Sequence, residues 1–186
     1  MKIIDIHRHS LVGEDRRISP KGVEVVQAAQ YLLPLDYQLY YVSPAPRCAD
    51  TLRTLGQVTF EEDDAFSGIP GAPLIPYLPQ LQEYVNFKGC STLEAYMHFH
   101  ETSAIVWETG RRVLDALLKI ASALPEDGRA LVISHSGAIE PAALIALGSR
   151  DAQDMGGQLG PCEGVRFEIE GGLVSRVVVR RLQPVE

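Results

Sequence analysis

The stretch that decides the fold is Met1-Lys-Ile-Ile-Asp-Ile-His-Arg-His-Ser10, in which an apolar run ends in basic side chains. Its isoleucines are β-branched, and such a run is typical of a buried strand. Arg8 and His9 then fall at the carboxyl end of that strand, where open α/β sheets bind their ligands. The stretch therefore predicts an α/β protein with a functional site at the end of its first strand.

Two later strands also end in polar residues. The strand expected at 38–42 leads into Ser43-Pro44-Ala45-Pro46-Arg47. The strand expected at 130–133 is fully apolar, as in the middle of a parallel sheet, and leads into Ser134-His135-Ser136-Gly137. We expect the three polar strand ends to form one site.

The segments after the first two strand ends predict helices. Ser19 suits the N-cap and Pro20 the first position of a helix that Pro34 ends. A second helix follows Arg47 and ends at Gly56. These crossovers are what a parallel sheet requires.

The middle of the chain is less regular in pattern. Residues 57–61 predict a third short strand. The Pro- and Gly-rich chain that follows predicts irregular structure from 63 to 79, and a lid or insertion over the site at about 63–90. Residues 91–124 predict one long helix or two, with a capping box at the start and a break at Gly110.

The end of the chain predicts a β-hairpin. Residues 165–179 alternate in polarity on both sides of Gly171-Gly172. The whole pattern predicts one α/β domain over residues 1–186. It is a three-layer sandwich in which helices flank a mostly parallel sheet with an antiparallel C-terminal edge hairpin.

Composition excludes several classes of function. The chain has 17 basic and 24 acidic residues and a net charge of -7, so no diffuse positive field would recruit nucleic acid or anionic lipid. No apolar segment approaches the ~20 residues of a membrane span, and the N-terminal apolar run is too short for a signal peptide. The three cysteines are widely spaced, which favours free thiols in a reducing cytosol. We therefore expect a cytoplasmic protein without nucleic acid or membrane partners; the oligomeric state is left open.

The polar strand ends resemble a known family. Arg8-His9-Ser10, then Ser43-Pro44 with Arg47, and finally Ser134-His135-Ser136-Gly137 are similar in order, spacing and strand context to the histidine phosphatase superfamily, also called phosphoglycerate-mutase-like. The resemblance covers nearly the whole chain except about residues 60–100. It implies a phosphatase that needs no metal or cofactor and forms a covalent phosphohistidine. The implied substrate is a phosphomonoester or phosphohistidine, carried by a small molecule or a phosphoprotein.

The residues support this chemistry on physical grounds. A phosphate monoester carries about -1.5 to -2 charges, and the guanidinium groups of Arg8 and Arg47 match its oxygens. A neutral imidazole can attack phosphorus, and the motif assigns that role to His9. His135 would then stabilise the charge on the transferring oxygens, together with the backbone amide of Ser136.

The chain also departs from the family. Ser10 stands where the family motif has glycine, and Gly68 takes the place of the acidic proton donor. Asp64, in the loop before the Pro- and Gly-rich segment, is our candidate for that donor. We further predict that Ser10, Arg16 and Ser136 contact the substrate. The lack of the usual acid favours phosphatase activity over mutase activity on phosphoglycerate.

Two alternatives from other functional classes stay open. The missing acid and Ser10 would also suit a catalytically weak or inactive module that binds a phosphorylated ligand. His7 and His9 resemble the strand-end His-x-His of metal-dependent amidohydrolases, in which both imidazoles bind a metal. Against this, amidohydrolases use a (β/α)₈ barrel of typically ~250 residues, and Arg47 would have no role.

Overall fold

The protein is built on a six-stranded sheet with the strand order β3-β2-β4-β1-β5-β6. The computed structural model describes residues 1–34 and 36–182. The strands are β1 (Lys2–Arg8), β2 (Leu39–Val42), β3 (Glu61–Glu62), β4 (Arg129–Ser134), β5 (Gly164–Glu170) and β6 (Leu173–Arg180). β1, β2, β3 and β4 run parallel, whereas β5 pairs antiparallel with both β1 and β6. The mostly parallel sheet and its antiparallel edge hairpin are therefore confirmed.

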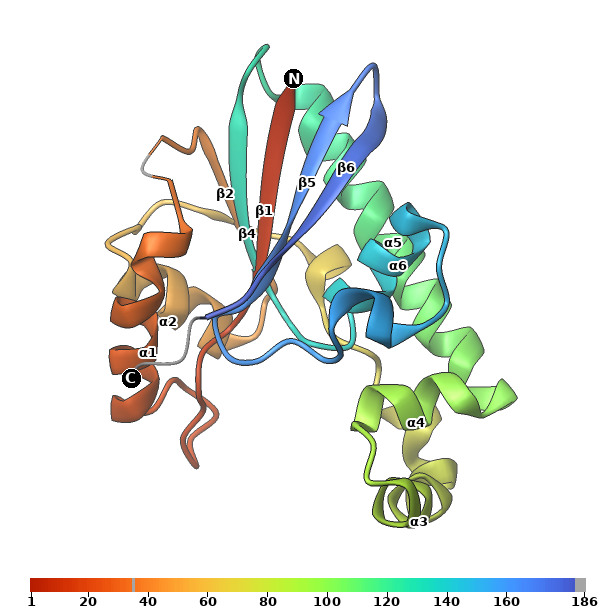
Figure 1. Cartoon of the computed structure of the whole chain (residues 1–186). Helices are drawn as coiled ribbons and strands as arrows, with labels where there is room; N and C mark the ends of the chain where they lie inside the picture. The colour runs from red at the N-terminus through yellow and green to blue at the C-terminus, as the bar shows by residue number, and fades with distance from the viewer. Residues whose placement is uncertain (35, 183–186) are drawn as a thin grey trace.

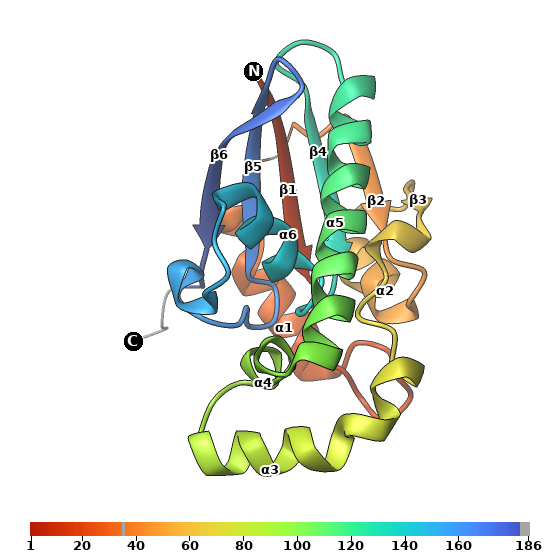
Figure 2. The same cartoon turned by 90° about the vertical axis from the view of Figure 1, so that its right-hand side faces the viewer.

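Helices cover both faces of the sheet. They are α1 (Pro20–Ala29), α2 (Pro46–Thr54), α3 (Leu78–Lys88), α4 (Thr92–His98), α5 (His100–Ala123) and α6 (Ile139–Leu147). Short 3₁₀ helices are η1 (Gln30–Leu32), η2 (Asp64–Phe66), η3 (Ala72–Tyr77) and η4 (Ala152–Met155). Figures 1 and 2 show α1 and α2 on one face, and α5 and α6 on the other. This is the predicted three-layer sandwich.

The core follows from the alternation of the buried strands. Ile4 and Ile6 of β1 point toward α5 and α6 and belong to the larger apolar cluster. On the other face, Leu131 and Ile133 of β4 pack with the buried side chains of α2. β4 and β1 are thus covered on both sides, and the strand ends that follow them are held rigidly.

Local signals in the sequence correspond to observed caps. Ser19 caps α1 by accepting a hydrogen bond from the amide of Gly22, and Pro20 occupies the first turn. Ser91 and Glu94 form the predicted capping box of α4. Gly56, after α2, has a φ of 87°, a conformation that favours glycine.

Three expectations about the middle of the chain are wrong. The third strand is only Glu61–Glu62, at the sheet edge, so residues 57–60 are not part of it. The expectation of irregular chain to Pro79 fails because prolines occupy the first turns of η3 and α3, where a missing N–H is tolerated. The long helical pattern breaks at Phe99 and not at Gly110. Gly110 lies inside α5, where a Cβ would come within 2.6 Å of Pro141 Cβ on α6, so its role is close helix packing.

α3 and α4 lie beyond the carboxyl ends of the parallel strands, on the side of α5 (Figures 1 and 2). Together with η3 they stand next to the polar strand ends. That this segment acts as a lid stays a prediction. Within residues 1–34 and 36–182, no helix combines the length and the apolar character that a membrane crossing requires.

Candidate active site

His9 follows β1 directly and is 9% exposed. Its Nδ1 lies 2.7 Å from the carbonyl oxygen of Ser10, which can only accept, so Nδ1 carries the proton and Nε2 carries the lone pair. Arg47 Nε donates to this Nε2 at 2.9 Å. Burial, assisted by the charges of Arg47 and Arg8, lowers the pKa of His9 to about 4. At neutral pH the ring is therefore an uncharged imidazole.

His135 follows β4 and faces His9, with the ring centroids 5.1 Å apart. Its Nδ1 lies 3.2 Å from Arg47 Nη2, which can only donate, so the proton of the neutral ring sits on Nε2 and points to Ser43 Oγ at 2.8 Å. Burial and the neighbouring positive charges lower its pKa to about 3. Arg47 therefore donates to both imidazoles at once.

Arg8 supplies the second guanidinium. It ends β1, and its Nη1 donates to the carbonyl oxygen of Leu159 at 2.6 Å. Its backbone amide donates to the carbonyl of Glu163 at 2.8 Å. The loop before β5 thus fixes both the backbone and the side chain of Arg8.

These side chains line a cavity of about 440 Å³. Its lining comprises Arg8, His9, Arg47, Gly68, Ile69, Gly71, Leu74, Thr92, Leu93, Tyr96, His135, Ser136, Gly137 and Gln158. A cavity of about 500 Å³ at the opposite end of the sheet is somewhat larger, but no histidine or arginine of the described chain lines it. We therefore take the cavity at the carboxyl ends of the strands as the candidate active site.

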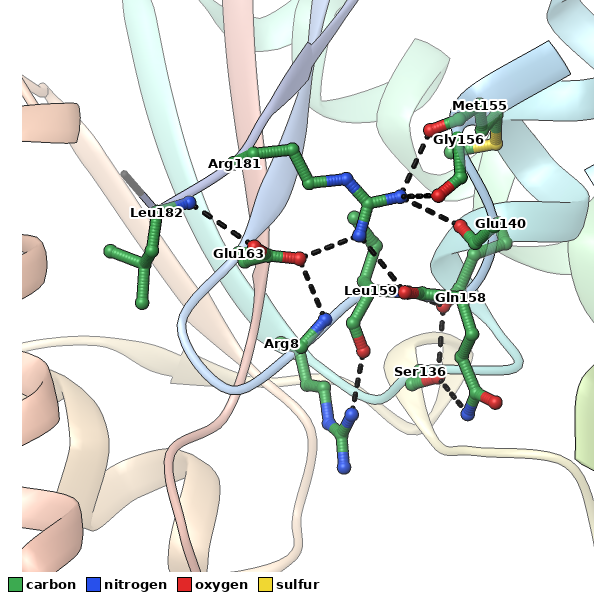
Figure 3. Close-up of polar contacts among 12 residues, drawn as sticks. Arg8, Ser136, Glu140, Met155, Gly156, Gln158, Leu159, Glu163, Arg181 and Leu182 are labelled. Carbon is green, nitrogen blue, oxygen red and sulfur yellow. Dashed lines mark hydrogen bonds and ion pairs between the residues drawn. The ribbon is translucent and has the colours of Figure 1, made fainter. Parts of the chain in front are cut away.

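A buried carboxylate supports one side of the cavity (Figure 3). Glu140, on the first turn of α6, is 1% exposed. It accepts hydrogen bonds from Ser136 Oγ at 2.8 Å, from the Gly137 amide at 2.6 Å and from the Leu159 amide at 2.9 Å. Gln158 Nε2 donates to the same Ser136 hydroxyl at 2.6 Å. Glu140 thus joins the loop after β4 to the loop that holds Arg8.

Arg181 fixes the far side of that loop (Figure 3). It donates to the carbonyl oxygens of residues 155–158 and pairs with Glu163 at 2.6 Å. Sequence reasoning missed Glu140, Gln158 and Arg181. Only Glu140 gave a signal, because it is a single acid in an otherwise apolar helix.

Three predicted site residues do not line the cavity. Ser10 is buried, and its Oγ donates to the carbonyl of Gly22 while its amide donates to Thr51 Oγ1. Arg16 is exposed in the turn before α1, with a φ of 64°. Asp64 is exposed in η2. The geometry gives Ser10 a structural role in joining α1 and α2, and contact of these three side chains with substrate stays a prediction.

The segment after η2 reaches the site through Gly68. A Cβ on Gly68 would lie 3.4 Å from His135 Cβ, so the backbone passes directly over that imidazole. Gly68, which the family resemblance aligns with the acidic proton donor, therefore lies beside His135.

His7 does not join His9. The side chain of His7 is 3% exposed, and its Nδ1 lies 2.8 Å from the carbonyl oxygen of Cys162. It does not line the cavity that His9 lines. Burial lowers its pKa. In the part of the chain that the structure describes, no group of three or more His, Cys, Asp or Glu side chains is placed to hold a metal ion. The amidohydrolase alternative is wrong at the level of fold, because the sheet is open and not a (β/α)₈ barrel.

Solved structures match the fold over almost its whole length. The phosphoserine phosphatase of Entamoeba histolytica, in complex with 3-phosphoglyceric acid, is 14% identical with a TM-score of 0.68 over 98% of both chains. A mycobacterial glucosyl-3-phosphoglycerate phosphatase in complex with VO3 is 15% identical with a TM-score of 0.69, covering 98% of this chain and 100% of that one.

The phosphoglycerate mutase of Bacillus anthracis is 15% identical with a TM-score of 0.66, over 96% of this chain and 91% of its own. The chain has the phosphoglycerate-mutase-like fold. No protein-family model matches its sequence, and no curated protein matches it. The comparisons therefore establish the fold, and the case for activity rests on the site.

Proposed function

We propose that the protein is a phosphatase that hydrolyses phosphomonoesters, or phosphohistidine, through a covalent phosphohistidine on His9. One observation carries the proposal. A buried neutral imidazole carries its lone pair on Nε2, where it accepts from Arg47, and it lines a cavity with two guanidinium groups, those of Arg8 and Arg47. An unprotonated imidazole is the form that attacks phosphorus.

Charge neutralisation is the task of the two arginines. A bound phosphate brings about -1.5 to -2 charges, which two guanidinium groups balance. In the proposed step Arg47 exchanges its hydrogen bonds with His9 and His135 for bonds to the phosphate oxygens. That exchange frees His9 Nε2 for attack. The Arg47 side chain therefore blocks the nucleophile before substrate binds and then binds the substrate.

Phosphoryl transfer then occurs in two steps. His9 Nε2 forms a bond to phosphorus while the bond to the leaving oxygen breaks, and that oxygen departs with the electron pair. Water next attacks the phosphohistidine, the P–N bond breaks, and inorganic phosphate leaves the neutral imidazole. His135 and the Ser136 amide are proposed to stabilise the charge on the transferring oxygens.

Other features of the proposal follow from the same site. No metal is required, because the two guanidinium groups of Arg8 and Arg47 already meet the charge of the phosphate. The structural neighbours complexed with 3-phosphoglyceric acid and VO3 support small phosphorylated substrates. We also propose a cytoplasmic location, where the free thiols of Cys48, Cys90 and Cys162 would stay reduced.

The test is phosphoenzyme trapping with a radiolabelled aryl phosphate. Rapid quench should yield an acid-labile label on the wild type that His9→Ala lacks, together with loss of turnover. His100→Asn, on the exposed start of α5, is the matched control and should keep both. Chelation should leave the rate unchanged, and vanadate should inhibit. Full turnover in His9→Ala would remove the assignment.

A second candidate function is a binding module that holds a phosphorylated ligand without turnover. The observation that favours it is the 2.9 Å hydrogen bond from Arg47 Nε to His9 Nε2, which occupies the lone pair needed for attack. Such a module would bind vanadate and phosphate in a titration but would never accumulate the labelled phosphoenzyme.

A further inference from the structure

Part of the cavity wall beyond the two arginines is apolar, and the polar side chains of Thr92, Ser136 and Gln158 that complete it carry no charge. Its apolar lining residues are Leu74 of η3, Leu93 of α4, Ile69 and Tyr96. Ile69 is held against the turn after His135, since a Cβ on Gly137 would lie 3.0 Å from Ile69 Cδ1. Side chains of this kind favour an apolar or aromatic ligand group.

Bound phosphate neutralises the positive charges that line the cavity. Among the described residues that line it, Arg8 and Arg47 are the only arginines or lysines, and none is an aspartate or glutamate. A phosphate dianion balances these two charges. A second anionic group on the substrate would find no cation, and a cationic group would find no carboxylate; burying either unpaired is costly.

Two carboxylates on the helices around the cavity, those of Glu94 and Glu140, are occupied by other hydrogen bonds. Glu94 lies on α4 between the lining residues Thr92 and Tyr96, but it accepts hydrogen bonds from Ser91 and Gln153. Glu140 accepts from three donors behind the cavity wall. A leaving group that needs a positioned acid is therefore poorly served, whereas an aryl oxide leaves with little protonation.

We infer that this site selects phosphomonoesters whose leaving group is uncharged and apolar, aryl phosphates above all, and discriminates against substrates with a second anionic group. The inference rests on the proposed function. In the transfer step the P–O(aryl) bond breaks as the P–Nε2 bond to His9 forms, and the aryl oxide takes its proton from water. The cavity wall of Leu74, Leu93 and Tyr96 contacts the ring.

The test compares phenyl phosphate with 4-carboxyphenyl phosphate, which adds one negative charge far from phosphorus. We expect kcat/KM to be about tenfold or more higher for phenyl phosphate, because the added carboxylate lies unpaired in the cavity. 3-Phosphoglycerate, an alkyl phosphate with a carboxylate, should be slower than both. Equal rates for the two aryl esters, or a preference for the carboxylated one, would overturn the inference.

A variant that adds a positive charge makes the test reciprocal. Thr92 is the exposed first residue of α4 and lines the cavity, so Thr92→Arg would place a cation in the wall. The ratio of kcat/KM for the carboxylated over the plain ester should rise about tenfold in Thr92→Arg. The matched variant Thr92→Gln, long but neutral, should leave that ratio near the wild-type value. A similar rise of this ratio in both variants would show that the charge of residue 92 does not determine the preference between the two esters.

Binding separates the inference from the proposed function. Calorimetric titration of His9→Ala with the two esters requires no chemistry. Tighter binding of phenyl phosphate without turnover of any ester by the wild type would support the inference and remove the phosphatase proposal. Turnover by the wild type together with tighter binding of 4-carboxyphenyl phosphate would support the phosphatase proposal and overturn the inference about the leaving group.

Discussion

Replacing Glu140 with glutamine tests whether the site depends on a buried carboxylate that touches neither His9 nor Arg47. Its Oε1 accepts from Ser136 Oγ and the Leu159 amide, and its Oε2 accepts from the Gly137 amide at 2.6 Å. Glutamine offers one acceptor oxygen. With that oxygen at Oε1, its NH₂ group would face the Gly137 N–H, donor against donor.

The expected cost follows from the bonds that are lost. A hydrogen bond to a charged group contributes roughly 1.5–3 kcal/mol, and a buried donor without a partner adds to the loss. We expect Glu140→Gln to lower the free energy of unfolding by on the order of 2–4 kcal/mol. For a chain of 186 residues this corresponds to a fall in Tm of roughly 4–16 °C.

Activity should fall as well, because the Leu159 peptide links Glu140 to Arg8. Its amide donates to the carboxylate, and its carbonyl accepts from Arg8 Nη1 at 2.6 Å. A displaced peptide would misplace the guanidinium, so the Kd for vanadate should rise about tenfold, equivalent to ~1.4 kcal/mol.

The assay is urea unfolding together with vanadate titration of the folded protein. Glu108→Gln, exposed on α5, is the control and should change neither quantity. Wild-type stability and vanadate affinity in Glu140→Gln would refute the reasoning. Lower stability with unchanged affinity would show that Glu140 supports the fold but not Arg8.

Three further predictions follow from other groups. His9 has a folded pKa of about 4 against 6.5 for the free side chain, so only the unfolded state gains a proton as pH falls through this window. His9 alone should lower stability between pH 6.5 and 4 by on the order of 3 kcal/mol, so in urea unfolding His9→Gln should decline by about that much less than the wild type. The rest of the decline stays in the variant, because burial also lowers the pKa values of His7 and His135. Arg166→Met should cost about 3–5 kcal/mol in urea unfolding, because Asp5 is 0% exposed and loses a bidentate partner at 2.9 Å; a loss below about 1 kcal/mol would contradict this. If Asp64 donates the proton, Asp64→Asn slows alkyl phosphates about 10²- to 10⁴-fold more than aryl phosphates; an equal response of both substrate classes would remove that assignment.

The strand ends were predictable because a single signal fixes them. An apolar run that stops at a basic or polar side chain marks both the strand and its carboxyl end, and parallel strands bring those ends to one edge. Arg8, His9, Arg47 and His135 could thus be assigned to one site from residues far apart in the chain. The structure brings all four to the same cavity.

The middle of the chain was harder because its signals are ambiguous. Proline excludes a helix interior but suits a first turn, and Pro79 stands in the first turn of α3. Gly110 breaks an isolated helix pattern, yet in α5 it provides the space that Pro141 fills. Whether a glycine or a proline interrupts a helix depends on tertiary neighbours that the local sequence does not reveal.

The supporting residues could not be predicted for a related reason. Leu159 acts through its backbone, which carries no sequence signal, and Arg181 acts by donating to carbonyl groups of a loop more than twenty residues earlier. These contacts matter because Arg8 and Arg47 are held differently. The guanidinium of Arg8 donates to the carbonyl of Leu159, whose amide is held by the buried carboxylate of Glu140. Among the described residues, the guanidinium of Arg47 donates instead to the two imidazoles of His9 and His135. In the proposed mechanism Arg8 keeps its place when phosphate binds, whereas Arg47 exchanges the imidazoles for phosphate oxygens. Substrate binding itself would then free Nε2 of His9 for attack.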